Sequence, residues 1–522
     1  MAEVRPEVPR PAIVFIGFMA AGKTRAAEAA ADRLGLAALD VDGLLESELG
    51  ESIASLFERG EEAEFRQREE ALTLKLLESG EGPGVIALGG GAIASEQVRE
   101  ALADHVCVWC DVDQELAWLR AEGSGRPLAV DREEFSRRYA ERQPLYESVA
   151  QVVLPSNARE AAYAAAPWIA ELRDAPPPLR EDVRMLWASS KSGGYPVFQG
   201  SGLIRSGFPA FDGRRFLVTD KNVGPRYASH LSPDGSLELE PGEAQKTLET
   251  AELVWAELVR FRMTRHDMLI ALGGGVVGDL AGFCAATYQR GVPLVQVPTT
   301  LVGQVDSAYG GKTGVDLPEA KNYIGAYHQP LAVLTDPSTL ETLPPEELAA
   351  GFVEVVKTAL IAGGALWERV RAIERLDPGE LGDVIFACAR TKLAVVAEDE
   401  RDSGRRAVLN LGHTVGHAIE ADTGYERYRH GEAVGLGLLA ALRLSGADEL
   451  REEVSSLLAA HGLPTALDPG VDVDGLLEAV GRDKKRTREG LGFVLLERPG
   501  EPRWGERVEP DRVRAAVEEL RE

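Results

Sequence analysis

Residues 12–24, AIVFIGFMAAGKT, decide the fold of the N-terminal part of the chain. An apolar run leads into the spacing G-x-x-x-x-G-K-[ST] from Gly17 to Thr24, and an alanine-rich stretch that predicts a helix follows. Strand, glycine-rich loop and helix in this order predict a phosphate-binding loop. Backbone N–H groups around Gly22 would cradle phosphates, Lys23 would reach the transferred phosphoryl group, and Thr24 would hold magnesium. The pattern predicts nucleotide binding and leaves the acceptor open.

Carboxylates, glycines and arginines farther along predict the rest of this site. LDVDG places Asp40 and Asp42 where a strand of a parallel sheet would end, within reach of magnesium and of a hydroxyl acceptor. Arginines in the predicted loops would bind a carboxylate or phosphates bidentately, because the guanidinium is a planar fork. The complete set is Asp40, Asp42, Arg66, Gly89, Gly90, Gly91, Arg126 and Arg142.

In this order the motifs GFMAAGKT, LDVDG, EFRQRE, LGGGA, RPL and RQPLYESVA resemble shikimate kinase over about residues 10 to 170. The resemblance implies that Asp42 orients or deprotonates the 3-hydroxyl of shikimate. It further implies that shikimate is held by Asp42, Arg66, Gly89, Gly90, Gly91 and Arg142, and that ATP is served by Lys23, Thr24 and Arg126. Two residues depart from the family pattern, Ala20 for a usual glycine and Arg25 for a small hydroxyl residue. A methyl group at position 20 would crowd a backbone with positive φ.

A second glycine-rich motif, MLIALGGGVVGDLAG at residues 268–282, opens another α/β part. Gly273, Gly275 and Gly278 fit G-x-G-x-x-G between a predicted strand and a predicted helix, which is typical of a Rossmann-like dinucleotide-binding fold. Residues at other predicted strand ends would face the same dinucleotide, namely Asp220, Glu243, Lys246, Thr299 and Thr300. Beyond Pro344 helical periodicity replaces the strand signals.

The histidines of the helical part gather in VLNLGHTVGHAIEADTGYERYRHGEAV, residues 408–434. His413 and His417 are four apart and share one helix face, and His430 follows after a glycine-bearing break. A single histidine is more commonly a core or solvated residue, but three of the chain's eight histidines lie within the eighteen residues from His413 to His430. Neutral imidazoles are frequent zinc ligands, so Glu354 of GFVEVVKTAL is our candidate for a further ligand.

The C-terminal part resembles 3-dehydroquinate synthase from about residue 183 to 522. The motifs that carry the resemblance are PGEAQK, GGGVVGDLAGF, RGVPLVQVPTTL, DSAYGGKTGV, KNYIGAYHQP, GFVEVVK, LNLGHTVGHAIE and HGEAV. It implies that the metal ligands are Glu354, His413 and His430, which makes His417 a polar active-site group. Leu317, Ala320 and Glu346 depart from the family pattern without removing a proposed contact.

The resemblance also assigns the cofactor and substrate contacts. The implied NAD contacts are Asp220, Glu243, Lys246, Gly274, Gly275, Asp279, Thr299, Thr300 and Thr342. The implied substrate contacts are Arg290, Asp306, Lys312, Lys321, Asn322, Lys357, Lys392, Arg406, Asn410 and Lys484 or Lys485. Of these, Lys312, Lys357, Arg406 and Asn410 join His417 as catalytic candidates.

These patterns predict an α/β fold with four segments. They are a P-loop kinase domain at 1–172, a Pro-rich solvated linker at 173–182, a Rossmann-like NAD-binding domain at 183–343 and an all-helical metal-binding domain at 344–522. A chain of 522 residues is too long for one ordinary core, which agrees with several domains.

The implied function is that of a bifunctional shikimate-pathway enzyme. ATP with magnesium would phosphorylate shikimate, and NAD with zinc or cobalt would support cyclisation of 3-deoxy-D-arabino-heptulosonate 7-phosphate to 3-dehydroquinate with release of phosphate. Another sugar-phosphate cyclase or a metal-dependent polyol dehydrogenase stays open for the C-terminal half. A different or regulatory P-loop module stays open for the N-terminal half. Phosphate release without net NADH would distinguish a cyclase from a dehydrogenase.

The net charge of −27 argues against nucleic acid or an anionic membrane as partner, and it requires local lysines and arginines for anionic substrates. No apolar run approaches a membrane-spanning length. Four cysteines argue against a disulfide framework, and CVWC reads as a buried strand, which together favour a reducing, cytoplasmic location. The synthase resemblance implies a homodimer formed through that half.

Overall fold

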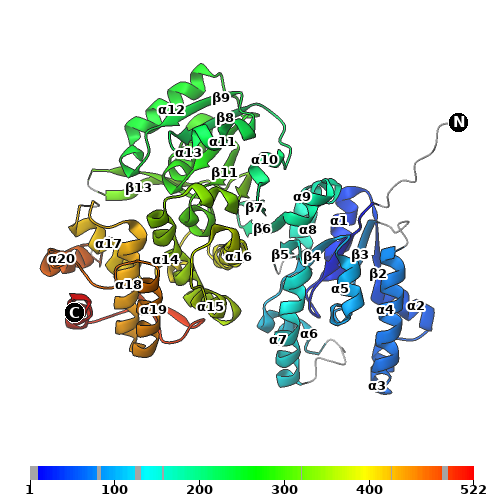
Figure 1. Cartoon of the computed structure of the whole chain (residues 1–522). Coiled ribbons are helices and arrows are strands. Elements are labelled where there is room, and N and C mark those ends of the chain that lie inside the picture. The colour runs from blue at the N-terminus through cyan, green and yellow to red at the C-terminus, as the bar shows by residue number, and fades with distance from the viewer. Residues whose placement is uncertain are drawn as a thin grey trace. The chain divides into compact units, whose positions relative to one another are not determined.

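The structure is a computed structural model that describes residues 10–78, 84–123, 131–155, 158–318, 320–424, 426–484 and 492–521, without the side chains of 481–484. The chain divides into two compact units. The first consists of Met1–Ser189, Gly194–Phe198 and Phe208–Phe211, and the second contains the remaining residues up to Glu522. Figure 1 labels the helices and strands of both units.

The first unit is built on a largely parallel sheet with β1 (Ile13–Ile16) at its centre. Its strand order is β2 (Ala37–Asp40), β3 (Gly84–Ala87), β1, β4 (Val106–Cys110), β5 (Val152–Leu154), β6 (Arg184–Ser190) and β7 (Gly193–Gln199). The pairs from β2 to β6 are parallel. All side chains of β1 and β4 are buried, and Cys107 and Cys110 are free thiols, so the prediction that CVWC is a buried strand is confirmed.

Helix α1 (Lys23–Leu34) starts directly after the glycine-rich loop, which confirms the predicted strand–loop–helix. It packs on α8 (Ala158–Asp174), and both helices bury alanine-rich faces that allow a close approach. The other helices of this unit are α2 (Val41–Leu49), α3 (Ile53–Glu58), α4 (Glu62–Glu78), α5 (Glu96–Leu102), α6 (Gln114–Ala121), α7 (Arg132–Val149) and α9 (Pro177–Asp182).

The predicted linker at 173–182 is helical at both ends. Helix α8 continues to Asp174, and α9 begins at Pro177, because proline is tolerated in the first turn of a helix. Strand β6 then pairs with β5, Met185 lying opposite Val152, so the sheet of the first unit continues past residue 182.

The second unit begins with an α/β part around a parallel sheet. Its strand order is β14 (Ala332–Thr335), β11 (Leu294–Pro298), β10 (Met268–Gly273), β8 (Arg215–Asp220) and β9 (Gly235–Leu239). Helices α12 (Leu248–Arg260) and α13 (Gly275–Thr287) bury apolar side chains against this sheet. Because β10 ends at Gly273 and α13 starts at Gly275, the predicted placement of the G-x-G-x-x-G motif is confirmed.

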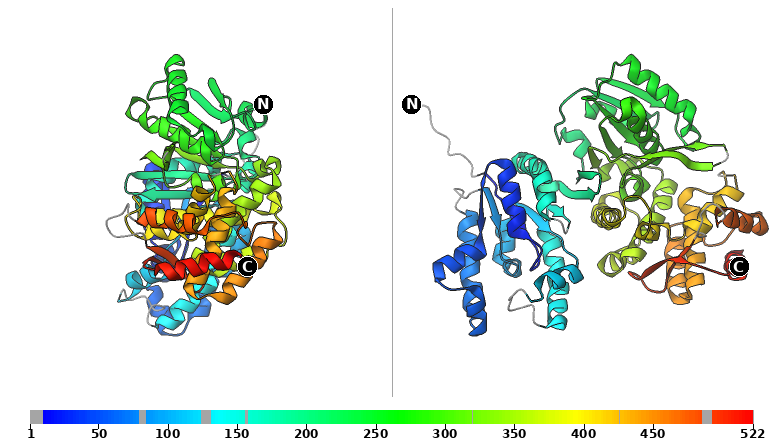
Figure 2. Two further views of the ribbon diagram at one scale, coloured as in Figure 1. Left: turned by 90° about the vertical axis from the view of Figure 1, so that its left-hand side faces the viewer. Right: turned by 180° about the vertical axis from the view of Figure 1, so that it is seen from behind.

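The helical part follows and shares one large apolar core. Its helices are α14 (Pro345–Ala362), α15 (Gly364–Arg371), α16 (Gly382–Glu398), α17 (His413–Asp422), α18 (His430–Ser445), α19 (Asp448–Ala460), α20 (Val473–Lys484) and α21 (Pro510–Glu518). In Figure 2 the helices from α17 onward are yellow to red and are distinct from the green α/β part of the same unit. Among the described residues, no helix is both long and apolar enough to span a membrane.

Some local predictions were wrong. Arg66 and Arg142, expected in loops, lie in α4 and α7. Lys312, Lys321 and Asn322, expected in a loop, lie in the antiparallel hairpin of β12 (Lys312–Leu317) and β13 (Ala320–Tyr327), where Gly314 faces Gly325. The helical part is not all-helical, because β15 (Phe493–Leu496) and β16 (Pro502–Glu506) form a hairpin from a short apolar run that has no helical period.

Candidate active sites

The first unit has a cavity of about 940 Å³ beside the phosphate-binding loop. Nine of the predicted kinase residues line it, namely Gly22, Lys23, Thr24, Asp40, Asp42, Arg66, Gly90, Gly91 and Arg142. Thr24 Oγ1 donates to Asp40 Oδ2 at 3.2 Å, which brings together the two groups expected near magnesium. Lys23 Nζ donates to the carbonyl oxygen of Phe18 at 3.1 Å.

The loop carries one backbone feature that the sequence predicted. Ala20 has φ of 61°, in the left-handed region that glycine adopts without strain. The replacement of a usual glycine by Ala20 therefore falls at a position where a methyl group has a conformational cost.

The buried carboxylate of Glu69 forms an ion pair with Arg66, one of the residues predicted to bind the acceptor. Arg66 Nη1 lies 2.6 Å from Glu69 Oε2, and Glu69 is 1% exposed. The glycines leave room for these groups, since a Cβ atom on Gly89 would come within 2.1 Å of Glu69 Oε1, and one on Gly91 within 2.0 Å of Arg66 Nη1. Arg142 Nη1 donates to the carbonyl oxygen of Gly90 at 2.9 Å. The residues predicted to bind the phosphoryl acceptor thus lie close to one another.

Asp42 lies in the first turn of α2, two residues beyond Asp40 at the end of β2. Burial raises the pKa of Asp42 to about 6, with Glu69 and Asp40 adding to the rise and Lys23 opposing it. A carboxyl with such a pKa can accept a proton from a hydroxyl near neutral pH.

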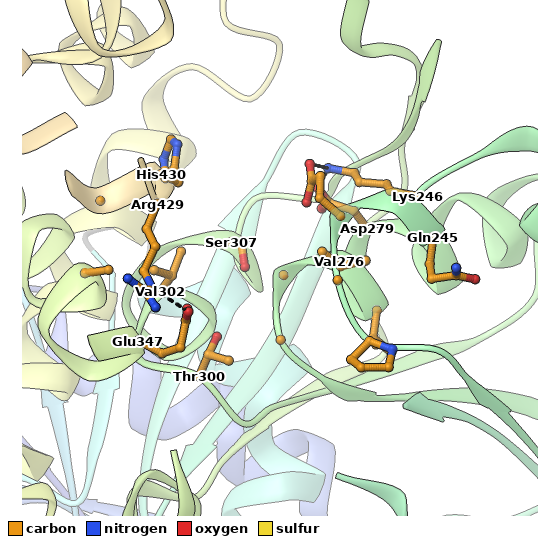
Figure 3. Close-up of a pocket in the computed structure, with 18 of the residues that line it drawn as sticks. Gln245, Lys246, Val276, Asp279, Thr300, Val302, Ser307, Glu347, Arg429 and His430 are labelled. Atoms are coloured by element: carbon orange, nitrogen blue, oxygen red, sulfur yellow. Dashed lines mark hydrogen bonds and ion pairs between the residues drawn. The ribbon is translucent and has the colours of Figure 1, made fainter. Parts of the chain in front are cut away.

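The second unit has a cavity of about 1260 Å³ between its α/β and helical parts. All nine predicted NAD residues line it, namely Asp220, Glu243, Lys246, Gly274, Gly275, Asp279, Thr299, Thr300 and Thr342. Asp220 ends β8, Gly274 follows β10 and Thr299 follows β11, so they lie at the carboxyl ends of adjacent parallel strands. Figure 3 shows Lys246 and Asp279 on one side of this cavity and Arg429 and His430 on the other.

Lys246 is almost fully buried beside two acids. Its Nζ lies 2.6 Å from Asp279 Oδ2 and 4.0 Å from Glu243 Oε1. Burial raises the pKa of Asp279 and that of Glu243, although Lys246 opposes both shifts. The ion pairs of Lys246 thus hold the side chains of Asp279 and Glu243 in place on the cavity wall.

The three predicted metal ligands converge, although they come from three different helices. Glu354 lies in α14, His413 starts α17 and His430 starts α18. Nε2 of His413 and Nε2 of His430 each lie 3.5 Å from Glu354 Oε1. Tetrahedral ligands at about 2.0–2.1 Å from zinc lie roughly 3.3–3.4 Å apart, so the spacing fits a bound cation.

The surroundings of Glu354 also fit a cation. Glu354 is 1% exposed, and its Oε1 accepts no hydrogen bond from the described residues. Burial by itself would raise the pKa of Glu354, but the charge of Lys357 and the histidines outweigh it and hold that pKa well below its ordinary value. Burial, aided by Lys357, lowers the pKa of His413 to about 3, so this imidazole is neutral and able to bind metal.

Two buried lysines lie beside the ligands and share one acid. Lys357 Nζ contacts Glu354 Oε2 and lies 3.9 Å from Asp306 Oδ1. Lys392 Nζ lies 2.8 Å from Asp306 Oδ1. Burial lowers the pKa of Lys392, and Asp306 opposes the shift. The group places two ammonium groups next to the metal ligands.

The remaining predicted residues have different settings. Asp306, Lys321, Asn322 and His417 line the cavity with His430. Arg406 is buried, and its guanidinium donates to the carbonyl oxygens of Glu400 and Gly310. Other residues are exposed and do not line this cavity, namely Arg290, Lys312 and Asn410. Arg126, Lys485 and the side chain of Lys484 fall outside the described part of the chain.

Three polar residues of these sites were missed by the sequence reasoning. Glu69 holds Arg66, and Arg120 of α6 lines the kinase cavity. Glu420 lies in α17 and contacts His430. The spacing His413, His417, Glu420 places all three on one helix face, a signal that could have revealed Glu420.

Comparison with known families supports both halves. A family model for shikimate kinase matches residues 19–173, and models for the N-terminal and C-terminal parts of 3-dehydroquinate synthase match residues 236–350 and 351–486. The 3-dehydroquinate synthase of Halorhodospira halophila is 45% identical over 335 residues, which cover 61% of this chain and 94% of that protein.

Two solved structures share the fold of the second half. A 2-deoxy-scyllo-inosose synthase complexed with carbaglucose-6-phosphate, NAD+ and Co2+ is 24% identical with a TM-score of 0.58, and the match covers 64% of this chain and 99% of that one. ValA, a 2-epi-5-epi-valiolone synthase from Streptomyces hygroscopicus with NAD+ and Zn2+ bound, is 27% identical with a TM-score of 0.55, over 62% of this chain and 96% of that one. The chain therefore belongs to the 3-dehydroquinate synthase family, and it carries a shikimate kinase domain ahead of the synthase part.

Proposed function

We propose that this bifunctional shikimate-pathway enzyme performs its two reactions in two separate cavities. Residues 1–172 would phosphorylate shikimate with ATP, and residues 183–343 and 344–522 would together convert 3-deoxy-D-arabino-heptulosonate 7-phosphate to 3-dehydroquinate. The observation that carries the proposal is the convergence of Glu354, His413 and His430 beside a cavity lined by the nine NAD candidates.

In the kinase site, Lys23 would stabilise the transferred phosphoryl group, and Thr24 with Asp40 would hold magnesium. Arg66 and Arg142 would bind the carboxylate of shikimate, and Glu69 keeps Arg66 in place for this contact. Asp42 would accept the proton of the 3-hydroxyl, a role that its raised pKa supports.

In the synthase site, Glu354, His413 and His430 would hold a divalent metal, zinc or cobalt, and the strand ends would hold NAD. When bound, the metal would acidify the alcohol group and NAD would accept and return a hydride. His417 lines the cavity and is available to move protons.

Anionic groups of the substrate need local positive charge, because the whole chain carries −27. Lys357 and Lys392 provide it beside the metal ligands, and Lys321 provides it on the cavity wall. We further assign substrate contacts to Arg290, Asp306, Lys312, Asn322, Arg406, Asn410 and Lys484 or Lys485.

A two-substrate assay on matched variants tests the assignment. Glu354→Gln should abolish phosphate release from the heptulosonate phosphate and weaken metal binding at least about 100-fold, because a charged ligand is lost. Lys23→Ala should abolish shikimate-dependent ADP formation. Each variant serves as the control for the other, since each should keep the activity that its own change does not touch. Loss of both activities in either variant would contradict separate sites.

Homodimerisation through the synthase half and a cytoplasmic location belong to the same proposal. A dimer should sediment with twice the mass of the 56.2 kDa chain. A species of the single-chain mass at all concentrations used in the activity assay would contradict it.

A further inference from the structure

Helix α17 presents a carboxylate on the same face as its two histidines. Glu420 follows His413 by seven residues and His417 by three, so all three project toward the same side of the helix. Glu420 is 4% exposed, and a carboxylate buried to this extent needs compensating partners. Its partners therefore indicate what it does.

The first partner of Glu420 is a proposed metal ligand. Nδ1 of His430 lies 3.3 Å from Glu420 Oε2, whereas Nε2 of the same ring lies 3.5 Å from Glu354 Oε1. A proton on Nδ1 that is donated to the carboxylate leaves Nε2 with a lone pair for the metal. Glu420 thus selects both the orientation and the tautomer of this imidazole.

His413 is anchored in the same manner by a different group. Its Nδ1 lies 3.2 Å from the carbonyl oxygen of Leu411, and its Nε2 points to Glu354 Oε1. The backbone provides the anchor of His413, whereas a side chain provides that of His430. Only the anchor of His430 can be removed by substitution.

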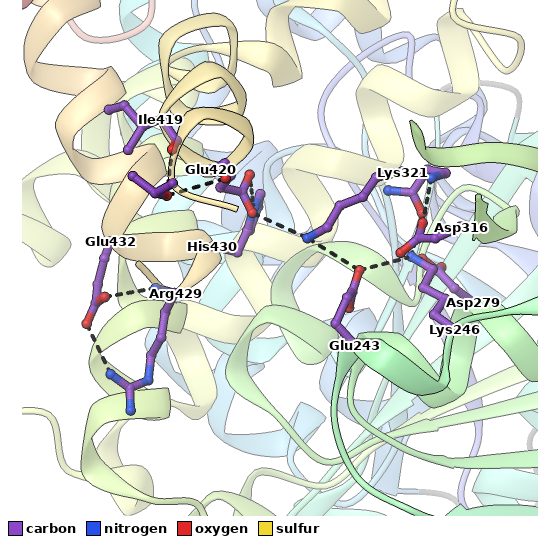
Figure 4. A network of polar contacts seen from close by, with 12 residues as sticks. Glu243, Lys246, Asp279, Asp316, Lys321, Ile419, Glu420, Arg429, His430 and Glu432 are labelled. Carbon is purple, nitrogen blue, oxygen red and sulfur yellow. Dashed lines mark hydrogen bonds and ion pairs between the residues drawn. The ribbon is translucent and has the colours of Figure 1, made fainter. Parts of the chain in front are cut away.

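The second partner of Glu420 is a lysine of the α/β part. Lys321 Nζ lies 3.7 Å from Glu420 Oε1 and 3.7 Å from Glu243 Oε1 (Figure 4). The lysine offsets the buried charge of Glu420, so the carboxylate stays ionised and remains a strong acceptor for the imidazole.

We infer that Glu420 is a positioning residue that orients His430 for metal binding. The inference rests on the proposed metal site. His417, Glu420 and His430 also bring one donor atom each within 4.8 Å of one another. Glu354 is the better ligand, because its Oε1 has no donor among the described residues, whereas Glu420 already pairs with Lys321 and His430.

Zinc binding to the full-length, metal-free chain tests the inference. Competition with a chromophoric chelator would give the zinc Kd of wild type, Glu420→Ala, Glu420→Gln and Glu432→Gln. Glu420→Ala should raise the Kd about 10–100-fold, as removal of an outer partner of a ligand does. Glu420→Gln keeps the size of the side chain and an acceptor oxygen, so its Kd should rise less than that of Glu420→Ala.

Glu432→Gln is the matched control, because Glu432 caps the same helix start through Arg429 N at 2.9 Å rather than through the imidazole. Its Kd should stay within about twofold of wild type, a change too small to represent a lost ligand contact. The visible spectrum of the cobalt-loaded Glu420→Ala chain should also differ from that of wild type, because a change in the position of His430 alters the ligand field of the cobalt ion.

Wild-type zinc affinity in Glu420→Ala would overturn the inference, and so would equal losses in Glu420→Ala and Glu420→Gln or in the Glu432→Gln control. Thermal unfolding of each metal-free variant separates a misplaced ligand from a misfolded chain, and the isosteric Glu420→Gln keeps the comparison possible if Glu420→Ala does not fold. Failure of the proposed metal site itself would look different, because Glu354→Gln would then bind zinc as tightly as wild type.

Discussion

Gly91 leaves room for the guanidinium that we assign to shikimate. A Cβ atom there would come within 2.0 Å of Arg66 Nη1, while the backbone at Gly91 has φ of −102°, which any residue adopts. Gly91→Ala should therefore displace Arg66 without straining the loop. Loss of one charge-assisted hydrogen bond costs roughly 1.5–3 kcal/mol, so the KM for shikimate should rise about 10–100-fold.

Steady-state kinetics with each substrate varied in turn would measure this effect. The KM for ATP and the synthase activity should both stay near wild type, because the change lies on the acceptor side of one cavity. An unchanged KM for shikimate would show that Arg66 does not bind the acceptor.

Two strands of the kinase sheet are joined through a neutral histidine. His105, just before β4, accepts a hydrogen bond at Nδ1 from the backbone N–H of Ala12, just before β1, at 2.9 Å. Burial lowers the pKa of His105, so the folded state disfavours its protonation. The unfolded chain binds that proton at about pH 6.5, and the stability of the first unit should fall as the pH drops through this value.

Thermal unfolding between pH 5 and 8 would measure the effect, with the kinase transition identified by its shift on addition of ATP and shikimate. His105→Gln is the control, because an amide oxygen can accept from Ala12 N–H but does not titrate. The wild type should lose stability relative to His105→Gln on the acidic side. Parallel curves for the two proteins would contradict the assignment.

Elements with a local signature could be predicted from the sequence, and contacts between distant elements could not. The strand, loop and helix around Lys23 and those around Gly275 were predicted correctly, because glycine spacing and apolar runs determine them locally. The hairpin of β12 and β13 was missed, since its polar, glycine-rich strands lack an alternating pattern. The periodicity of α4 was hidden by its charged residues, so Arg66 was expected in a loop.

The candidate metal site also depends on contacts between distant elements, which the sequence alone does not predict. The local pair His413 and His417 suggested a metal site, but which histidine faces Glu354 depends on how α14, α17 and α18 pack. Family resemblance, not spacing, identified His430 as the partner. The helical spacing of His413, His417 and Glu420 placed Glu420 on the same face, but its contact with His430 depends on the packing of α17 against α18.

At the scale of the whole molecule, the two cavities belong to different compact units. Removal of the metal should therefore stop one reaction only. Incubation with 1,10-phenanthroline in the presence of excess magnesium should abolish phosphate release from the heptulosonate phosphate and leave shikimate-dependent ADP formation unchanged. Added zinc should restore the lost activity, because the ligands remain in place.

Both activities are read from the same treated sample, so the kinase reaction controls for general damage to the protein. A parallel decline of the two activities, restored together by zinc, would show that the kinase also depends on the metal site.

The pairing of β5 with β6 has a practical consequence for anyone who wishes to separate the two enzymes. A gene split after codon 182 would divide a continuous ladder of strands and leave Val152 and Val153 without the neighbours at Met185 and Leu186. Bare strand edges invite self-association, so the severed kinase would tend to aggregate even with its catalytic groups intact. The first compact unit thus extends past residue 182, and β6 has to stay with the kinase sheet in any such split.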